Sequence, residues 1–121
     1  MTRMRYKDFT FPHNPRKIQV DGGQRLAEHR CLDGRTVLEV LGRQRRQVDA
    51  QGELTGSQAW RQLEQLVFLA GEETPGLLAL PGMDPFPAYC TGIDFLGEGD
   101  GQVLGYRIRF QEAGEEGRTI G

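Results

Sequence analysis

The spacing of glycine is the feature that most constrains how this chain can fold. Seventeen glycines lie among its 121 residues, spread along the chain rather than clustered. Glycine weakens a helix interior, whereas in a tight turn it adopts positive φ angles without strain. The spacing therefore favours one domain of short strands and turns, and a chain of this length can bury a core without disulfides or a metal.

Alternating apolar residues predict the first strands. Residues 5–11 place Phe9 and Phe11 on one face, and Pro12 then breaks the strand. Residues 17–20 predict a second strand, because Asp21-Gly22-Gly23 has the glycines that a tight reversal needs. We therefore expect the N-terminal segment to be an edge strand or arm.

A β-hairpin is predicted in the second quarter of the chain. Segments 26–32 and 35–42 flank Asp33-Gly34, a pair that suits a two-residue hairpin turn. The apolar residues of 37–41 fit a helix about as well as a strand, and the turn together with the β-branched residues favours the strand. Residues 47–54 continue in extended form.

One helix is predicted from about Ser57 to Ala70. Apolar residues recur there at spacings of three and four, in the order Ala59, Trp60, Leu63, Leu66, Val67 and Ala70. Thr55 with Gln58 has the form of a capping box, Ser57 is an alternative cap, and Gly71 suits a left-handed stop. A short strand is predicted at 77–80, between two Pro-Gly pairs.

The C-terminal part predicts a second hairpin. Segments 88–96 and 102–112 alternate around the glycine-rich loop 97–101. Within the second segment one face carries Tyr106, Ile108 and Phe110 and the other carries Arg107, Arg109 and Gln111. This pattern is typical of a sheet with one buried side and one wet side.

Composition excludes several classes of function. The formal net charge is −2, and no apolar run approaches the roughly 20 residues of a membrane helix. We therefore expect neither specific nucleic-acid binding nor a membrane span, and expect folding in a cytoplasm. Cys31 and Cys90 sit in alternating segments, which favours reduced core thiols over a disulfide framework.

No constellation of residues predicts catalysis or a cofactor. His13, His29, Cys31 and Cys90 could in principle bind zinc, but their spacing matches no familiar zinc pair. Neither cysteine has the local signature of a nucleophile. The loop 97–101 carries acidic residues that repel phosphate and has too few oxygen ligands for tight calcium binding. We therefore predict that the protein is not an enzyme.

Basic and aromatic residues outside the predicted core are candidates for contacts. Arg43, Arg45 and Arg46 form the main basic cluster, and alternation places the first two on one face. Solvated or subunit-pairing arginines are favoured over nucleic-acid contacts, because no exposed aromatics are interleaved with them. Phe86 lies in a rigid Pro-bounded turn, where packing on the domain is favoured over contact with a partner.

Strands, one helix and further strands predict an α+β, mainly β fold: an antiparallel sandwich or barrel with the helix packed on it. In this arrangement the chain resembles the domain shared by phage tail-tube proteins, distal-tail proteins and the N-terminal part of DNA-circulation proteins of contractile-tailed phages. The resemblance rests on Val48 to Leu54 before the helix, Leu63 and Leu66 within it, 75–82 after it, and the closing 106–112.

The resemblance implies a structural protein of a phage, prophage or phage-derived contractile tail. Similar tail proteins form six-fold rings through the sheet edges of neighbouring subunits, so the implied partners are other copies and neighbouring tail or baseplate proteins. The implied location is a virion tail or tail-like particle assembled in the bacterial host cytoplasm. We expect one domain over 1–121, with an N-terminal arm at 1–15 and a flexible tail at 113–121.

The candidate assembly contacts lie in the N-terminal arm, the basic cluster and the Pro-bounded turn: Phe9, Phe11, Pro12, Asn14, Pro15, Arg43, Arg45, Arg46 and Phe86. An alternative function is a small β-rich module that recognises a protein or carbohydrate through its sheet face. Tyr6, Tyr89 and Phe86 are its possible anchors.

Overall fold

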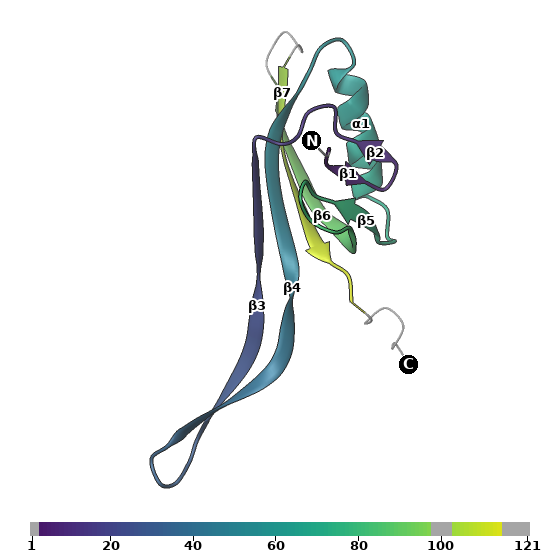
Figure 1. The fold of residues 1–121 in the computed structure, drawn as a ribbon. Coiled ribbons are helices and arrows are strands. Elements are labelled where there is room, and N and C mark those ends of the chain that lie inside the picture. Colours follow the sequence, from purple (N-terminus) through teal and green to yellow (C-terminus); the bar gives the residue numbers. More distant parts are fainter. Residues whose placement is uncertain (1–2, 98–102, 115–121) are drawn as a thin grey trace.

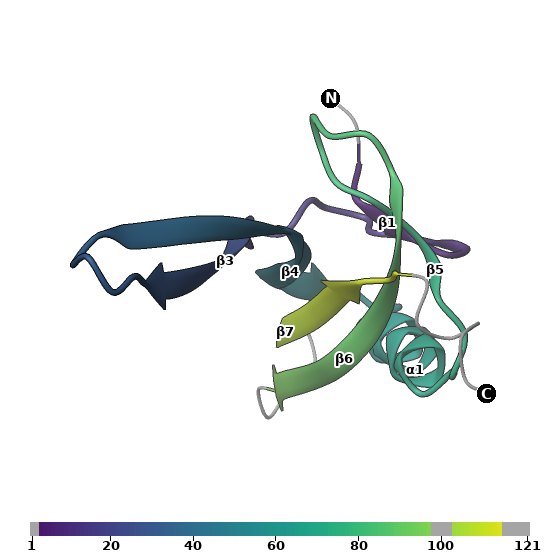
Figure 2. The same ribbon diagram turned by 90° about the horizontal axis from the view of Figure 1, so that it is seen from below.

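The chain folds into one antiparallel sheet with a helix on one face (Figures 1 and 2). The computed structural model describes residues 3–97 and 103–114. Their elements are β1 Arg5–Tyr6, β2 Phe9–Thr10, β3 Lys17–Arg30, β4 Thr36–Thr55, α1 Ala59–Ala70, β5 Gly76–Ala79, β6 Phe86–Gly97 and β7 Val103–Glu112.

The strand order is β2-β1-β5-β6-β7-β4-β3, and every neighbouring pair is antiparallel. The predicted mainly β fold with one packed helix is confirmed. The sheet is open, however, and is not closed into a barrel: among the described residues β2 and β3 are its two outer strands.

The core lies between α1 and the inner face of β4 and β7. Alternate residues of the two strands are buried there, as the pattern of 106–110 predicts. They are Val48, Ala50 and Leu54 of β4 and Leu104, Tyr106, Ile108 and Phe110 of β7. Gly52 lies in the same row of β4, where a Cβ atom would come within 2.8 Å of the Tyr106 hydroxyl oxygen and 3.0 Å of the backbone of Pro15.

The N-terminal segment completes this core. Met4, Tyr6, Phe9 and Phe11 are buried, and the Tyr6 and Phe110 rings lie 4.8 Å apart between centroids. The side chain of Asn14 fixes the start of the segment, because its Oδ1 accepts a hydrogen bond of 2.8 Å from the Met4 backbone N–H. Residues 4–15 therefore fold back onto the domain.

The helix matches its prediction in position but differs at both ends. Only Ala59, Leu63 and Leu66 of its apolar stripe are fully buried, while Trp60 and Val67 are about half exposed. Neither Thr55 nor Ser57 caps the helix, because β4 runs to Thr55 and Gly56 turns the chain with φ at 90°. The predicted left-handed stop is also wrong, since Gly71 has φ at −86°.

A hairpin around Asp33-Gly34 is confirmed, with Gly34 at φ 92°, but the two-residue turn is wrong, because the Cys31 N–H bonds to the Arg35 carbonyl and leaves three residues between them. The strands of the hairpin are also far longer than predicted. Residues 17–20 and 26–30 belong to one 14-residue strand, and 36–42 and 47–54 belong to one 20-residue strand. The distal half of this hairpin projects away from the domain (Figure 1). We call residues 23–44 the arm and the remainder of the described chain the body. Most of the predicted loop 97–101 and of the tail 113–121 lies outside the described residues.

Replacing a buried helix residue tests the position of this core. Leu66→Ala is expected to lower the free energy of unfolding by about 2–5 kcal/mol, because a fully buried side chain leaves a cavity. The neighbouring Val67→Ala, at a half-exposed position, should change it by no more than about 0.5 kcal/mol. Urea unfolding of both variants measures the difference, and equal losses would place the core elsewhere.

Candidate assembly interface

Among the described residues the body has two long open sheet edges, in addition to the outer side of the two-residue strand β2. β3 pairs with β4 on one side only, and no strand pairs with the outer side of Tyr89–Gly97 within the residues that the structure describes. β5 covers β6 only as far as Ala88. Unpaired backbone N–H and C=O groups at such edges are ready to pair with another strand.

Apolar side chains lie beside both edges, on the face that carries the core. On β3, Ile18 pairs in register with the buried Ala50 and Val20 pairs with the buried Val48. On β6, a matching row of half-buried residues lies opposite buried residues of β7, and it consists of Cys90, Ile93 and Phe95. Each edge thus presents an apolar row that the chain itself leaves partly uncovered.

An aromatic pair extends the apolar row of β6. The Trp60 ring of α1 meets the Phe95 ring edge to face at 5.3 Å between centroids. Both side chains are exposed by more than 40% of their surface. Tryptophan and other aromatic residues dominate the binding energy of many protein interfaces, so this pair is the strongest candidate anchor beside the β6 edge.

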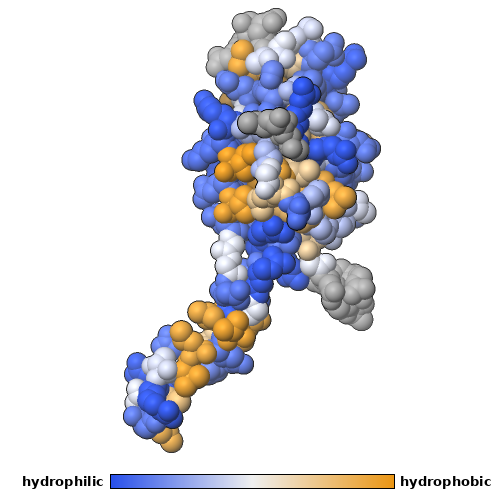
Figure 3. Space-filling view, viewed as in Figure 1, coloured by the Kyte–Doolittle hydropathy of each residue, from blue (hydrophilic) through white to orange (hydrophobic). Residues whose placement is uncertain are grey.

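The arm is apolar on both faces. Leu26 lies opposite Val40 and therefore on the same face. Leu38 lies on that face too, because it precedes Val40 by two residues in β4. Val37, opposite His29, lies on the other face. These four side chains are each between 46% and 67% exposed, and apolar residues gather along the arm in Figure 3. A two-stranded ribbon has no core of its own and gains stability from a partner surface.

A buried carboxylate ties the arm to the body. Glu112, the last residue of β7, is only 7% exposed. It accepts hydrogen bonds from Arg43 Nη1 at 2.8 Å, from the Arg46 backbone N–H at 2.9 Å and from Arg46 Nη2 at 3.0 Å. The Arg46 guanidinium also stacks on the Phe86 ring, 3.9 Å from its centroid. The hydrogen bonds of Arg46 and then of Arg43 lower the pKa of Glu112 from its ordinary 4.5 to about 2.

Ion pairs cover the wet face of the sheet. Arg107 of β7 makes a bidentate contact with Asp49 of β4, with a shortest distance of 2.6 Å, and Arg109 Nη1 lies 2.8 Å from Asp94 Oδ2 of β6. The hydrogen bond from Arg107 lowers the pKa of Asp49. These charges are neutralised within the chain, so this face is polar without a strong field of one sign.

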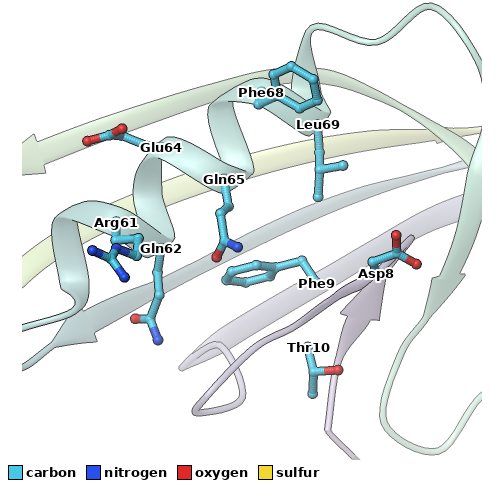
Figure 4. A pocket seen from close by; sticks show the side chains of 9 residues that line it. All are labelled: Asp8, Phe9, Thr10, Arg61, Gln62, Glu64, Gln65, Phe68 and Leu69. Carbon is cyan, nitrogen blue, oxygen red and sulfur yellow. The ribbon is translucent and has the colours of Figure 1, made fainter.

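A pocket of about 670 Å³ lies between α1 and the β1–β2 turn (Figure 4). Asp8 and Phe9 line one side, and Arg61, Gln62 and Phe68 of the helix line the other. The lining residues include no cysteine, serine, lysine or histidine. Over residues 3–97 and 103–114, no three His, Cys, Asp or Glu side chains gather as a metal site would require.

The structure separates the residues that the sequence suggested as contacts. Phe9 and Phe11 are buried in the core with Pro15, and Pro12 and Asn14 are partly covered. In this conformation Phe11 is unavailable to another molecule, and Phe9 exposes only a small part of its ring, in the pocket beside α1. Cys31 lies at the tip of the arm and Cys90 beside the core, both as free thiols.

The basic cluster lies at the base of the arm. Arg43 and Arg46 bind Glu112, and Phe86 is buried beneath Arg46, which agrees with the expectation that Phe86 packs on the domain. Arg45 lies close to Gly114. Sequence reasoning missed Glu112, although alternation places it on the apolar face of Ile108 and Phe110, where a carboxylate needs a cationic partner.

No family model and no curated protein matches this sequence. Solved structures do. A chain from the tail of an empty gene transfer agent particle, refined with C6 symmetry, has a TM-score of 0.58 at 19% identity, over 83% of this chain and 78% of that one. The SPP1 Dit protein, a hub adsorption protein of phages that infect Gram-positive bacteria, gives 0.65 at 11% identity, over 91% of this chain and 49% of that one.

A chain from the sheath–tube complex of PVC, an extracellular contractile injection system, gives a TM-score of 0.58 at 10% identity, over 93% of this chain and 84% of that one. Each of the three matches spans at least 83% of this chain. This chain has the phage tail-tube-like fold. In the part of the tail-tube-like domain that the structure describes, no helix is long and apolar enough to cross a membrane.

The depressed pKa of Glu112 makes the stability of this tail-tube-like domain depend on pH. Because its pKa is about 2 in the folded chain and 4.5 ordinarily, the stabilisation is complete above 4.5 and is lost as the pH falls toward 2. Glu112→Gln should therefore flatten the loss of unfolding free energy across that window, measured by urea unfolding at a series of pH values. The exposed Glu73→Gln is the control, and identical profiles for the two variants would contradict the assignment.

Proposed function

We propose that this chain is a structural subunit of a phage, prophage or phage-derived contractile tail, and that copies of it assemble into a closed ring through their open sheet edges. The observation that carries the proposal is the pair of unpaired edges, β3 and β6, each flanked by a partly exposed apolar row. The similar tail proteins support a structural role, and the C6 symmetry of one tail makes six the expected number of copies.

Strand direction supports pairing of β3 with β6 of the next copy. The strands β6, β7, β4 and β3 alternate in direction, so β3 and β6 run opposite ways. When copies are related by rotation about an axis roughly along the strands, β3 of one copy meets the neighbouring β6 in antiparallel orientation. An even number of strands therefore lets one antiparallel sheet continue from copy to copy and close.

The apolar rows favour the same contact. Pairing of β3 with a neighbouring β6 places Ile18 and Val20 on the face where that neighbour presents Ile93, Phe95 and Trp60. The contact is heterologous, since two different surfaces meet. Such a contact extends indefinitely unless the rotation between copies closes it into a ring.

Ring closure also fixes which face lines the channel. α1 packs on the core face of β6, β4 and β7, so this face is the thicker one and belongs on the outside. The wet face, with its Arg107–Asp49 and Arg109–Asp94 pairs, then lines the interior. A lining of paired charges is polar and offers little attraction to a passing charged molecule.

The arm supplies a second contact with neighbouring copies or tail proteins. It reaches beyond its own body and exposes apolar side chains on both faces, so its partner must come from another molecule (Figures 1 and 3). Within an assembled tail the nearest surfaces are those of other copies, in the same ring or in the one stacked on it. We therefore assign the arm to contacts between copies, in a virion tail or tail-like particle.

A charge placed on either edge tests the pairing of β3 with β6. Val20→Lys and Phe95→Lys should each prevent assembly, because a lysine beside an unpaired edge opposes the addition of a strand. Phe68→Lys is the matched control: Phe68 is 72% exposed on α1 and lines the pocket near β1–β2 rather than an edge.

Sedimentation velocity across a concentration series measures the outcome. Wild type and the Phe68 variant should form a discrete large species, and the two edge variants should stay monomeric. A wild-type monomer at every concentration would instead support the small binding module, and assembly that survives both edge charges would place the interface elsewhere.

Shortening the hairpin tests the arm separately. Replacing residues 24–42 by Asn-Gly should leave the circular dichroism spectrum of a folded β protein, because no arm residue belongs to the buried core. Electron microscopy should then show rings without stacked tubes. Normal stacking of the shortened chain would exclude the arm from contacts between rings.

A further inference from the structure

We propose that Glu112 is the positioning residue of the arm: its carboxylate locks the base of the arm to β7, so that the arm leaves the body in one fixed direction. The consequence for assembly rests on the function proposed above, whereas the lock itself does not. The lock lies where β7 ends beside β4 and the sheet narrows to the two-stranded ribbon of β3 and β4.

Glu112 stands at that transition. The last residue pair between β4 and β7 is Gln47 with Gln111. Beyond it β4 continues without β7, and the Arg46 N–H, which would otherwise lack a strand partner on that side, donates to Glu112 Oε1 at 2.9 Å. The carboxylate thus accepts the hydrogen bond that a further residue of β7 would otherwise accept, and it fixes Arg46, the first residue of β4 beyond the pairing with β7.

The pairing of β3 with β4 is irregular at two places near the base of the arm. The β3–β4 register shifts between Asp21 and Gly23 and again between Arg25 and Leu26. Gly42, opposite Arg25, has φ at 119°, a value that favours glycine. Bulges bend and twist a strand pair, so the direction of the arm is set at these two places and not by the straight segments between them.

The Glu112 cluster holds this bend against the body. Arg43 and Arg46 of β4 both donate hydrogen bonds to the Glu112 carboxylate. The Arg46 guanidinium also stacks on the ring of Phe86 in β6. Arg25 of β3 and Arg45 of β4 line the adjoining pocket of about 380 Å³. Several arginines therefore face one buried carboxylate.

Breaking some of the hydrogen bonds to the buried Glu112 carboxylate is costly. The cluster therefore favours the one arm direction in which all of these bonds form. A fixed arm also loses less conformational freedom on binding than a swinging one. Loss of the carboxylate should therefore weaken assembly on the order of tenfold, although Glu112 is buried and need not contact any neighbouring copy.

The distance between arm and body tests the lock directly. Spin labels are placed on Cys31, at the tip of the arm, and on Glu73→Cys, in the exposed turn after α1, with Cys90→Ala removing the second native thiol. Val20→Lys is included so that each full-length chain is read as a monomer, whether or not the ring proposal is correct. Electron–electron double resonance then gives the distribution of distances between the labels.

The parent chain should give one narrow distribution of distances between the labels. In Glu112→Gln this distribution should become broad. Arg43→Gln, at a side chain that is 60% exposed, should broaden the distance as well and guards against a Glu112 variant that fails to fold. Asp49→Asn is the matched control, because it removes an ion-paired carboxylate from the same pair of strands inside the body and should leave the distance narrow.

A narrow, unchanged distance in both folded Glu112→Gln and Arg43→Gln would overturn the lock. Broadening in Asp49→Asn to the same extent would also overturn it, because the effect would then come from general loosening of the sheet. Failure of the ring proposal has a different signature: the chain without Val20→Lys would stay monomeric while the distances still separated the variants as expected.

Discussion

The continuity of β4 is the constraint on which the rest of the structure depends. One strand of 20 residues, Thr36–Thr55, supplies buried residues to the core at one end and half of an exposed arm at the other. Because side chains alternate along it, a slip of one residue would turn Val48 and Ala50 out to water. The strand that fixes the register of the core therefore also forms half of the arm, and the two register shifts between β3 and β4 set how the arm leaves the body.

This arrangement leaves contact surface on the single chain. Within the described residues β3 and most of β6 each have an open edge, and the arm exposes about half or more of several large apolar side chains. Stable monomers protect long edges and limit exposed apolar surface. A subunit of a closed assembly uses both as contacts, which is how the tail-tube-like fold and the proposed role fit together.

The sequence predicted local structure where one side of an element is buried. Alternation identified the inner face of β7, spacing identified α1, and Asp33-Gly34 identified the hairpin turn. Sequence-based prediction failed where one strand passes from the body into the exposed arm. Gly22-Gly23 has the composition of a tight turn, yet it lies within β3, because a register shift between Asp21 and Gly23 accommodates it there. Assembly surfaces carry no sequence motif. Any half-exposed apolar row is a candidate contact until the structure shows whether an open strand edge lies beside it.

The most direct measurement for the central claim is covalent linkage of the two edges. A chain with Val20→Cys and Phe95→Cys, and with Cys31 and Cys90 replaced by serine, is treated with a short bismaleimide and analysed by denaturing electrophoresis. Pairing of β3 with β6 predicts a ladder of linked copies that ends at a fixed number, together with no ladder when either introduced cysteine is absent. Linkage that stops at a dimer, or no linkage at concentrations where the chain associates, would contradict a ring closed through these edges.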